Sequence, residues 1–320
     1  MSSRYVSHSH FGWQGIVAII IACFFWGTTG TAASFTPDVS PLATGAFAMG
    51  GGGVLLVVYA MNNLINDKGR LLINYKLMMS GGFSVALYPL AFYSSMRLSG
   101  VAVGTVVSIA SAPFFTVLLE CLISKKSLSR QWVVSFTLGA IGIVLLALSK
   151  DTHDASDSQH WDHYFGIVLG LVAGVSYAVY SWSARGMIEQ GIDSKSAMAC
   201  MFGLAALVLL PSLFITGENL FASNINSVVA VYMAVIPMFL GYVLFGYGLK
   251  FVEASQATLI TLLEPVVATI MAVVIVRESI STMGWIGIGL ILWCLWMQVP
   301  KARSKNKISL SAQLESQAMS

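Results

Sequence analysis

Long apolar runs separated by short polar segments fill nearly the whole chain. Runs of about 18 or more apolar residues are long enough to cross the hydrocarbon core of a bilayer as helices. The pattern predicts ten membrane-spanning helices, and their short connections indicate that neighbours run antiparallel. The helices are expected at 13–33, 42–62, 75–96, 102–123, 131–149, 164–184, 196–216, 227–249, 255–276 and 282–299.

The second half of this pattern repeats the first. Residues 88–148 align with 240–300 at a constant offset of 152, which places Pro113 on Pro265. Each half holds five predicted helices, and because five is odd the second half must lie upside down relative to the first. Inverted repeats place a substrate site near the bilayer midplane, and their rocking alternates access to it. The predicted units are a first repeat (1–150), an external linker (151–163), a second repeat (164–300) and a cytoplasmic tail (301–320).

Composition excludes a water-soluble protein. The chain is 57% hydrophobic and only 10% charged, whereas soluble domains carry about 25% charged residues. The apolar run near the N-terminus is interpreted as a retained first helix rather than a signal peptide, because its repeat partner at 164–184 lies in mid-chain. The four cysteines are isolated within apolar runs and are interpreted as packing residues, so we expect no metal and no cofactor.

The distribution of basic residues predicts the orientation. With a cytoplasmic N-terminus, 14 of the 17 Lys and Arg residues face the cytoplasm, and only Arg97, Lys150 and Arg277 face outward. The positive-inside rule therefore predicts that both termini are cytoplasmic. The linker is then external, and its His153, His160 and His163 lie among aspartates. We interpret it as a solvated polar linker, with a surface metal site as the alternative.

Two matching stretches carry a resemblance to a known family. The stretch SGVAVGTVVSIASAPFFTVLLECLISKKSLS is matched by VEASQATLITLLEPVVATIMAVVIVRESIS, and Trp26-Gly27 lies late in the first helix. With ten helices in two halves, the chain resembles the EamA-type branch of the drug/metabolite transporter superfamily. That resemblance implies a multi-pass transporter of the inner membrane that moves small metabolites, commonly exporting amino acids or related compounds.

The chain departs from the family pattern at two places. Lys126 stands in the first repeat where the second has the family-like Glu278. The second predicted helix lacks an arginine that many relatives carry near its start, which makes an anionic substrate less expected here.

Glu264 is the strongest candidate for substrate chemistry. It lies about ten residues, or roughly 15 Å, into the ninth predicted helix and therefore near the midplane. A carboxylate there is costly unless it is paired, hydrated or protonated, so a functional role is the default hypothesis. It is expected to bind a substrate amine or to carry a coupling proton, and a protonated structural glutamate is the alternative. Thr261, one helical turn earlier, is expected to share its face of the helix.

Two prolines and a hydroxyl residue extend the candidate set. Pro113 and Pro265 each free a backbone carbonyl in mid-helix, either to bind ligand or only to kink the helix for packing. Ser108 lies on the same predicted helix as Pro113 and is a candidate binding residue. Glu120, near the end of that helix, is interpreted as one side of an interfacial ion pair with the neighbouring lysines.

Aromatic side chains at depth complete the candidate site. Trp26, Tyr88, Tyr180 and Tyr242 each offer a ring and a hydrogen-bonding group, which suits amphipathic metabolites. The family resemblance ranks the three tyrosines first, because the third, sixth and eighth helices surround the cavity in that family. Most aromatics in a membrane bundle instead face lipid or fill packing space.

These features favour a secondary transporter that exports amino acids or similar metabolites by alternating access. No nucleotide-binding or catalytic motif is present in the sequence, so an enzyme is not expected. An uptake carrier for an amine or quaternary cation is the first alternative, and a membrane sensor or assembly subunit without transport is the second. The expected partners are a small-molecule substrate, membrane lipid and protons, without nucleic acid, for a monomer or homodimer.

Overall fold

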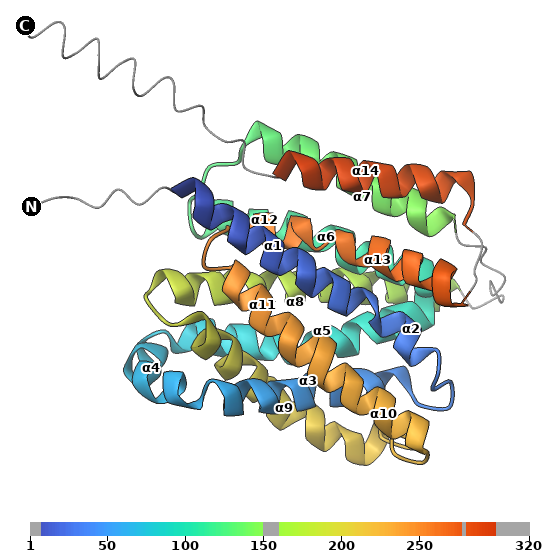
Figure 1. The fold of residues 1–320 in the computed structure, drawn as a ribbon, viewed down its shortest axis with the longest axis horizontal. Coiled ribbons are helices and arrows are strands. Elements are labelled where there is room, and N and C mark those ends of the chain that lie inside the picture. Colours follow the sequence, from blue (N-terminus) through green and yellow to red (C-terminus); the bar gives the residue numbers. More distant parts are fainter. Residues whose placement is uncertain (1–7, 150–159, 277–279, 299–320) are drawn as a thin grey trace, which may run out of the picture.

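The computed structural model describes residues 8–149, 160–276 and 280–298, and all regular structure in these ranges is helical (Figure 1). The helices in chain order are α1 (His8–Gly27), α2 (Thr29–Ala33), α3 (Pro41–Tyr59), α4 (Met61–Ile73), α5 (Tyr75–Ser99), α6 (Val101–Leu122), α7 (Arg130–Leu148), α8 (His160–Glu189), α9 (Ser194–Thr216), α10 (Asn224–Met233), the π-helix η1 (Ala234–Leu240), α11 (Gly241–Gly248), α12 (Ala254–Ile260), α13 (Leu263–Met271), the π-helix η2 (Ala272–Val276) and α14 (Thr282–Gln298).

Every predicted apolar run coincides with helix. Eight helical segments of the described chain are long and apolar enough to cross a membrane. The two remaining runs are α5, whose serines and glycines lower its hydropathy, and α14, an apolar helix of 17 residues. The all-helical membrane fold is thus confirmed, whereas ten crossings remain a prediction.

Three predicted helices are interrupted. The first run divides into α1 and α2 at Thr28, and the eighth contains the π-helix η1 around Pro237. Proline cannot donate a backbone hydrogen bond, so a wider turn at that position is expected. The ninth run breaks at Thr261 and Leu262, between α12 and α13. These breaks shape the centre of the molecule.

One helix was not predicted. α4 follows α3 directly and has apolar and charged residues on opposite faces. Its buried Asp67 accepts hydrogen bonds from the Asp193 backbone N–H (3.0 Å) and the Ser196 hydroxyl (2.8 Å). A segment of 13 residues containing Lys68 and Arg70 is too short and too charged to span a bilayer, so hydropathy does not identify it. Its amphipathic character is typical of a helix at the membrane surface.

Helices that correspond in the two halves pack antiparallel against each other. α7 and α14 are related by the sequence offset, and Gln131 at the start of α7 donates to the Met297 carbonyl at the end of α14. Backbones approach closely where Gly142 meets Gly287, because a Cβ on either glycine would lie under 3 Å from the other's carbonyl oxygen. α3 and α9 also pair antiparallel, through close contacts of Gly50 with Leu210 and Gly53 with Phe202.

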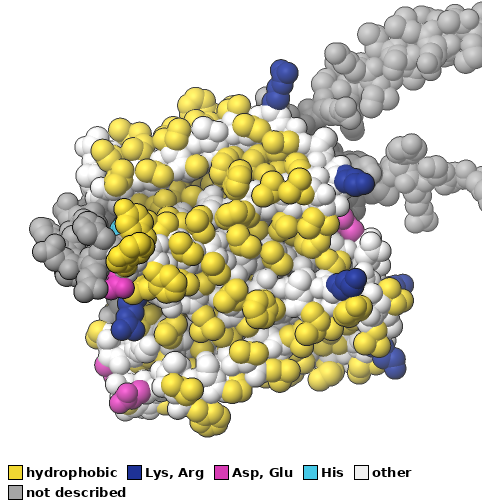
Figure 2. All heavy atoms as spheres, turned by 180° about the vertical axis from the view of Figure 1, so that it is seen from behind, with side chains coloured by type: hydrophobic (Ala, Val, Ile, Leu, Met, Phe, Trp, Pro, Cys, Tyr) yellow, Lys and Arg dark blue, Asp and Glu magenta, His cyan; other side chains and the backbone are white. Residues whose placement is uncertain are grey.

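The outer surface is strongly apolar. Side chains such as Phe214, Ile215 and Ile73 are at least 81% exposed, which is untenable for a protein surrounded by water. Figure 2 shows hydrophobic side chains across the middle of one face and most of its visible Lys and Arg side chains toward one end. A lipid-facing belt with charged ends is the surface expected of a multi-pass membrane protein.

Candidate functional site

A small cavity of about 60 Å³ lies at the centre of the bundle. Residues of the first half line it from α1, α2, α3 and α5, and residues of the second half from α8, η1, α11 and α13. The lining consists of Trp26, Thr29, Gly45, Met49, Tyr88, Pro89, Phe92, Tyr93, Tyr177, Tyr180, Met238, Tyr242 and Glu264. This space is sufficient for a few water molecules but not for a metabolite, so a metabolite needs the cavity to widen.

Glu264 is the only acidic residue of the lining. It lies in the first turn of α13, directly after the break that ends α12. The partial positive charge of a helix N-terminus favours a carboxylate at this position. Within the described residues, the Glu264 carboxylate has no hydrogen bond or ion pair, and its side chain is only partly buried. The break therefore presents an unpaired carboxylate to the cavity.

The aromatic rings form a packed layer around this carboxylate. Tyr177 and Tyr180 are stacked with ring centroids 5.0 Å apart, and Tyr88 meets both of them edge-on. Trp26 packs against Tyr242 at 4.9 Å between centroids. Such geometries are the favourable ones for aromatic pairs and hold each ring in place.

Several polar groups of this layer are already engaged. The Tyr177 hydroxyl donates to Thr261 Oγ1 (2.9 Å), and the Tyr180 and Tyr242 hydroxyls share a hydrogen bond (3.2 Å). Trp26 Nε1 donates to the Pro237 carbonyl (2.8 Å) inside η1. These bonds cross between helices and fix which ring faces point into the cavity.

The structure brings together five of the sequence-predicted residues: Glu264, Trp26, Tyr88, Tyr180 and Tyr242 all line the cavity. Thr261 lies behind them. Its buried hydroxyl accepts from Tyr177 and donates to the Thr258 carbonyl (2.8 Å), so it supports a lining tyrosine.

Three predicted residues are not in the cavity lining. Ser108 is fully buried and donates to the Gly104 carbonyl within α6 (2.7 Å), and Pro113 is buried in the same uninterrupted helix. Pro265 lies next to Glu264 but outside the lining. The carbonyl that its missing N–H would have bonded, Thr261 O, accepts from the Glu264 backbone N–H instead (3.0 Å). This carbonyl is therefore not presented to a ligand.

Sequence reasoning missed several lining residues. Tyr93, Met49 and Met238 lie among many similar apolar positions, and nothing in the sequence singles them out. Pro89 and Pro237 carried a usable signal, because proline in mid-helix removes one backbone hydrogen bond, as it does at Pro265. Pro89 lines the cavity, and the Pro237 carbonyl holds Trp26.

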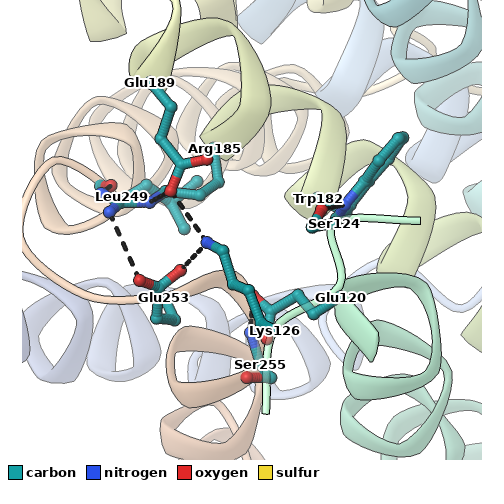
Figure 3. Close-up of polar contacts among 9 residues, drawn as sticks. All are labelled: Glu120, Ser124, Lys126, Trp182, Arg185, Glu189, Leu249, Glu253 and Ser255. Atoms are coloured by element: carbon teal, nitrogen blue, oxygen red, sulfur yellow. Dashed lines mark hydrogen bonds and ion pairs between the residues drawn. The ribbon is translucent and has the colours of Figure 1, made fainter. Parts of the chain in front are cut away.

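A second polar cluster lies at the C-terminal end of α8, which is the end predicted to face the cytoplasm (Figure 3). Lys126, in the connection between α6 and α7, contacts Glu189 Oε1 (2.8 Å) and Glu253 Oε2. Arg185 reaches Glu189 (3.0 Å), Glu253 (3.6 Å) and the Leu249 carbonyl (2.6 Å). Partial burial opposes the charge of Lys126, but its hydrogen bonds with Glu189 and Glu253 outweigh this and raise its pKa. Lys126 is therefore charged at neutral pH.

Glu120 differs from its predicted role. Lys126 pairs with Glu189 and Glu253, while the buried Glu120 carboxylate accepts the backbone N–H of Ser255 at the start of α12 (3.2 Å). The expected ion pair of Glu120 is thus replaced by a cap on a helix terminus. An open cavity of about 780 Å³ is lined in part by Glu120 and Lys126.

Other sequence-level candidates lie beyond what the structure describes. Glu278 and most of the histidine-containing linker are outside the described residues. Among the residues that are described, no group of three or more His, Cys, Asp or Glu side chains could hold a metal ion.

Comparisons with known proteins agree with this architecture. The sequence profile of the EamA-like transporter family matches residues 13–148 and again 164–298. The chain is similar to the uncharacterized transporter YwfM of Bacillus subtilis, with 30% identity over 92% of this chain and 97% of the relative. A crystal structure of another protein shares the fold, with a TM-score of 0.71 at 18% identity, over 91% of this chain and 95% of that one.

Two further relatives have more specific names. A probable amino-acid metabolite efflux pump of Salmonella typhimurium is 24% identical, over 70% of this chain and 76% of the relative. The uncharacterized inner membrane transporter YedA of Escherichia coli is 26% identical, over 62% of this chain and 60% of the relative. Since one profile matches both halves and one relative aligns with nearly the whole chain, this multi-pass inner-membrane protein belongs to the EamA-like transporter family.

Proposed function

We propose that the chain is a secondary transporter that exports amino acids or related metabolites by alternating access. The observation that carries the proposal is a central cavity lined by both halves, with an unpaired carboxylate where one lining helix breaks. A site between two halves changes its opening when the halves rock, without any new fold. The antiparallel pairing of α7 with α14 and of α3 with α9 supports the inverted arrangement on which such rocking depends.

The proposed architecture comprises ten crossings in two inverted repeats with both termini in the cytoplasm. Export of amino-acid-related compounds is supported by the printed function of the Salmonella relative. The family and its relatives are transporters, so we propose no enzymatic activity. The driving force comes from an ion gradient, with Glu264 as the group that takes up and releases a proton.

Proteoliposomes with an imposed pH gradient test the proton role. The wild-type protein should accumulate substrate, whereas Glu264→Gln should abolish gradient-driven accumulation, because a neutral amide cannot exchange a proton at this position. Glu218→Gln, which alters an exposed carboxylate in the connection between α9 and α10, serves as the control and should behave as wild type. Unchanged accumulation by Glu264→Gln would contradict the proton role.

A further inference from the structure

The cavity has one formal charge and no countercharge. Glu264 is the sole charged residue of the lining, which otherwise consists of aromatic, apolar, glycine and threonine residues. None of the lining residues in the described chain is Lys, Arg or His. A carboxylate within a membrane bundle is normally paired with a cation or other polar group. The partner missing from the protein is therefore expected to be a positive charge on the ligand.

The lining offers a ligand carboxylate only neutral donors, and within the described residues only the Tyr88 and Tyr93 hydroxyls among them have no hydrogen bond. Trp26, Tyr177 and Thr29 already donate to the Pro237 carbonyl, Thr261 Oγ1 and the Trp26 carbonyl, respectively. The Tyr180 and Tyr242 hydroxyls bond to each other. An amino-acid carboxylate would lie close to Glu264 with no Lys, Arg or His in the lining, and like charges at short range disfavour binding.

The ring faces suit a positively charged group. Aromatic faces attract ammonium groups within about 6 Å of the ring centre, most strongly when water is excluded. Tyr88, Phe92, Tyr177 and Trp26 surround the space next to Glu264. In the present conformation, a cavity of about 60 Å³ has room for an ammonium group but not for a large body. The remainder of a ligand needs the widening that alternating access supplies.

We infer that the substrates of this transporter are organic ammonium ions that carry an apolar or aromatic body and no carboxylate. The inference rests on the proposed transport function; among amino acids and related metabolites it selects the amines that lack a carboxylate and excludes the amino acids themselves. It separates amines from their parent α-amino acids, which differ from them only by the carboxylate. Glu264 would bind the ammonium group, and the aromatic rings would contact the charged group and the adjoining carbons.

Matched pairs of an amine and its parent amino acid test this directly. Phenethylamine is compared with phenylalanine and tyramine with tyrosine, by counterflow into proteoliposomes and by thermal shift of the purified wild-type protein. Each amine should exchange with a half-saturating concentration at least tenfold below that of its parent. Each should also raise the melting temperature at concentrations where its parent does not, because a ligand stabilises the folded form that binds it.

Substitutions then locate the effect. Glu264→Gln should raise the half-saturating concentration of each amine in counterflow at least tenfold. Glu218→Gln should leave this concentration within twofold of the wild-type value. Because the wild-type comparison needs no variant, a folding defect of Glu264→Gln would not hide the answer. Exchange of phenylalanine or tyrosine in preference to the amine would overturn the substrate class while transport stands. Absence of counterflow with these compounds and with a broad metabolite pool would instead overturn the proposed transport function, and the inference with it.

Discussion

Close packing around Gly45 shows how single positions shape the cavity. A Cβ on Gly45 would lie 2.3 Å from Cε2 of the Tyr93 ring, a separation that real atoms do not tolerate. Glycine is therefore needed here for space, and both residues line the cavity. The glycine run of α3 could be identified from the sequence as a packing surface, but the sequence could not reveal which glycine faces the site.

Gly45→Ala should push the Tyr93 ring into the cavity and reduce substrate counterflow at least fivefold. The cost of forcing one methyl group into packed space is about 1–3 kcal/mol, so the variant should fold with a lower melting temperature. Gly30→Ala is the matched control, since a Cβ there meets nothing within 4 Å. It should transport within twofold of wild type. Equal rates for the two variants would show that Tyr93 does not define the site.

At the scale of elements, sequence predicted where helices lie better than where they break. Hydropathy located the apolar runs because burial in lipid imposes a long continuous signal. The breaks at Thr28, Pro237 and Thr261–Leu262 depend on one or two residues in a run that remains apolar throughout. Glu264 was identified because a charge at depth is rare. Ser108 was misplaced because a small hydroxyl residue is equally suited to back-bonding within its own helix, as it does here.

The charged cluster at the C-terminal end of α8, called the latch below, joins the two halves by ion pairs. Lys126 is its contribution from the first half, while Arg185, Glu189 and Glu253 all belong to the second half. Arg185 follows Tyr180 of the cavity by five residues, or roughly 7.5 Å along α8. These ion pairs therefore join the two halves at the end away from Trp26 and Gly45, and a motion that parts the halves there must break the pairs.

Lys126→Gln should shift the protein toward the state that is open at this end. Lys126 makes two partly exposed ion pairs that contribute about 0.2–1 kcal/mol each, so losing both should shift the population by up to about thirtyfold. The rate at which the Cys23 thiol is alkylated reports this shift. Cys23 is fully buried beside the Ile260 carbonyl, between the latch and the cavity. In a variant that keeps Cys23 as its single cysteine, alkylation should accelerate with Lys126→Gln. Lys126→Arg preserves the charge and should alkylate at the wild-type rate; identical rates for both variants would contradict the latch.

For the whole molecule, orientation decides which compartment the cavity faces. Its lining comes from the end of α1, from α2 and from the start of α3, so it lies nearer the end of the bundle opposite the latch. If the latch end faces the cytoplasm, as the distribution of 14 of the 17 basic residues predicts, the halves are joined on the inner side and the site lies toward the outside. An exporter in this state would be poised to release its substrate.

Single cysteines in a cysteine-free background test that orientation. The variants are Glu218→Cys and Gln190→Cys. Residue 218 lies in the exposed connection after α9 and residue 190 in the exposed turn before α9, so the two positions flank one predicted membrane crossing. In intact cells, a membrane-impermeant maleimide should label residue 218 and should reach residue 190 only after permeabilisation. The reverse pattern would place the basic end outside and turn the cavity toward the cytoplasm. Export would then begin, rather than end, with the conformation described here, because substrate would enter the site from the compartment that the cavity faces.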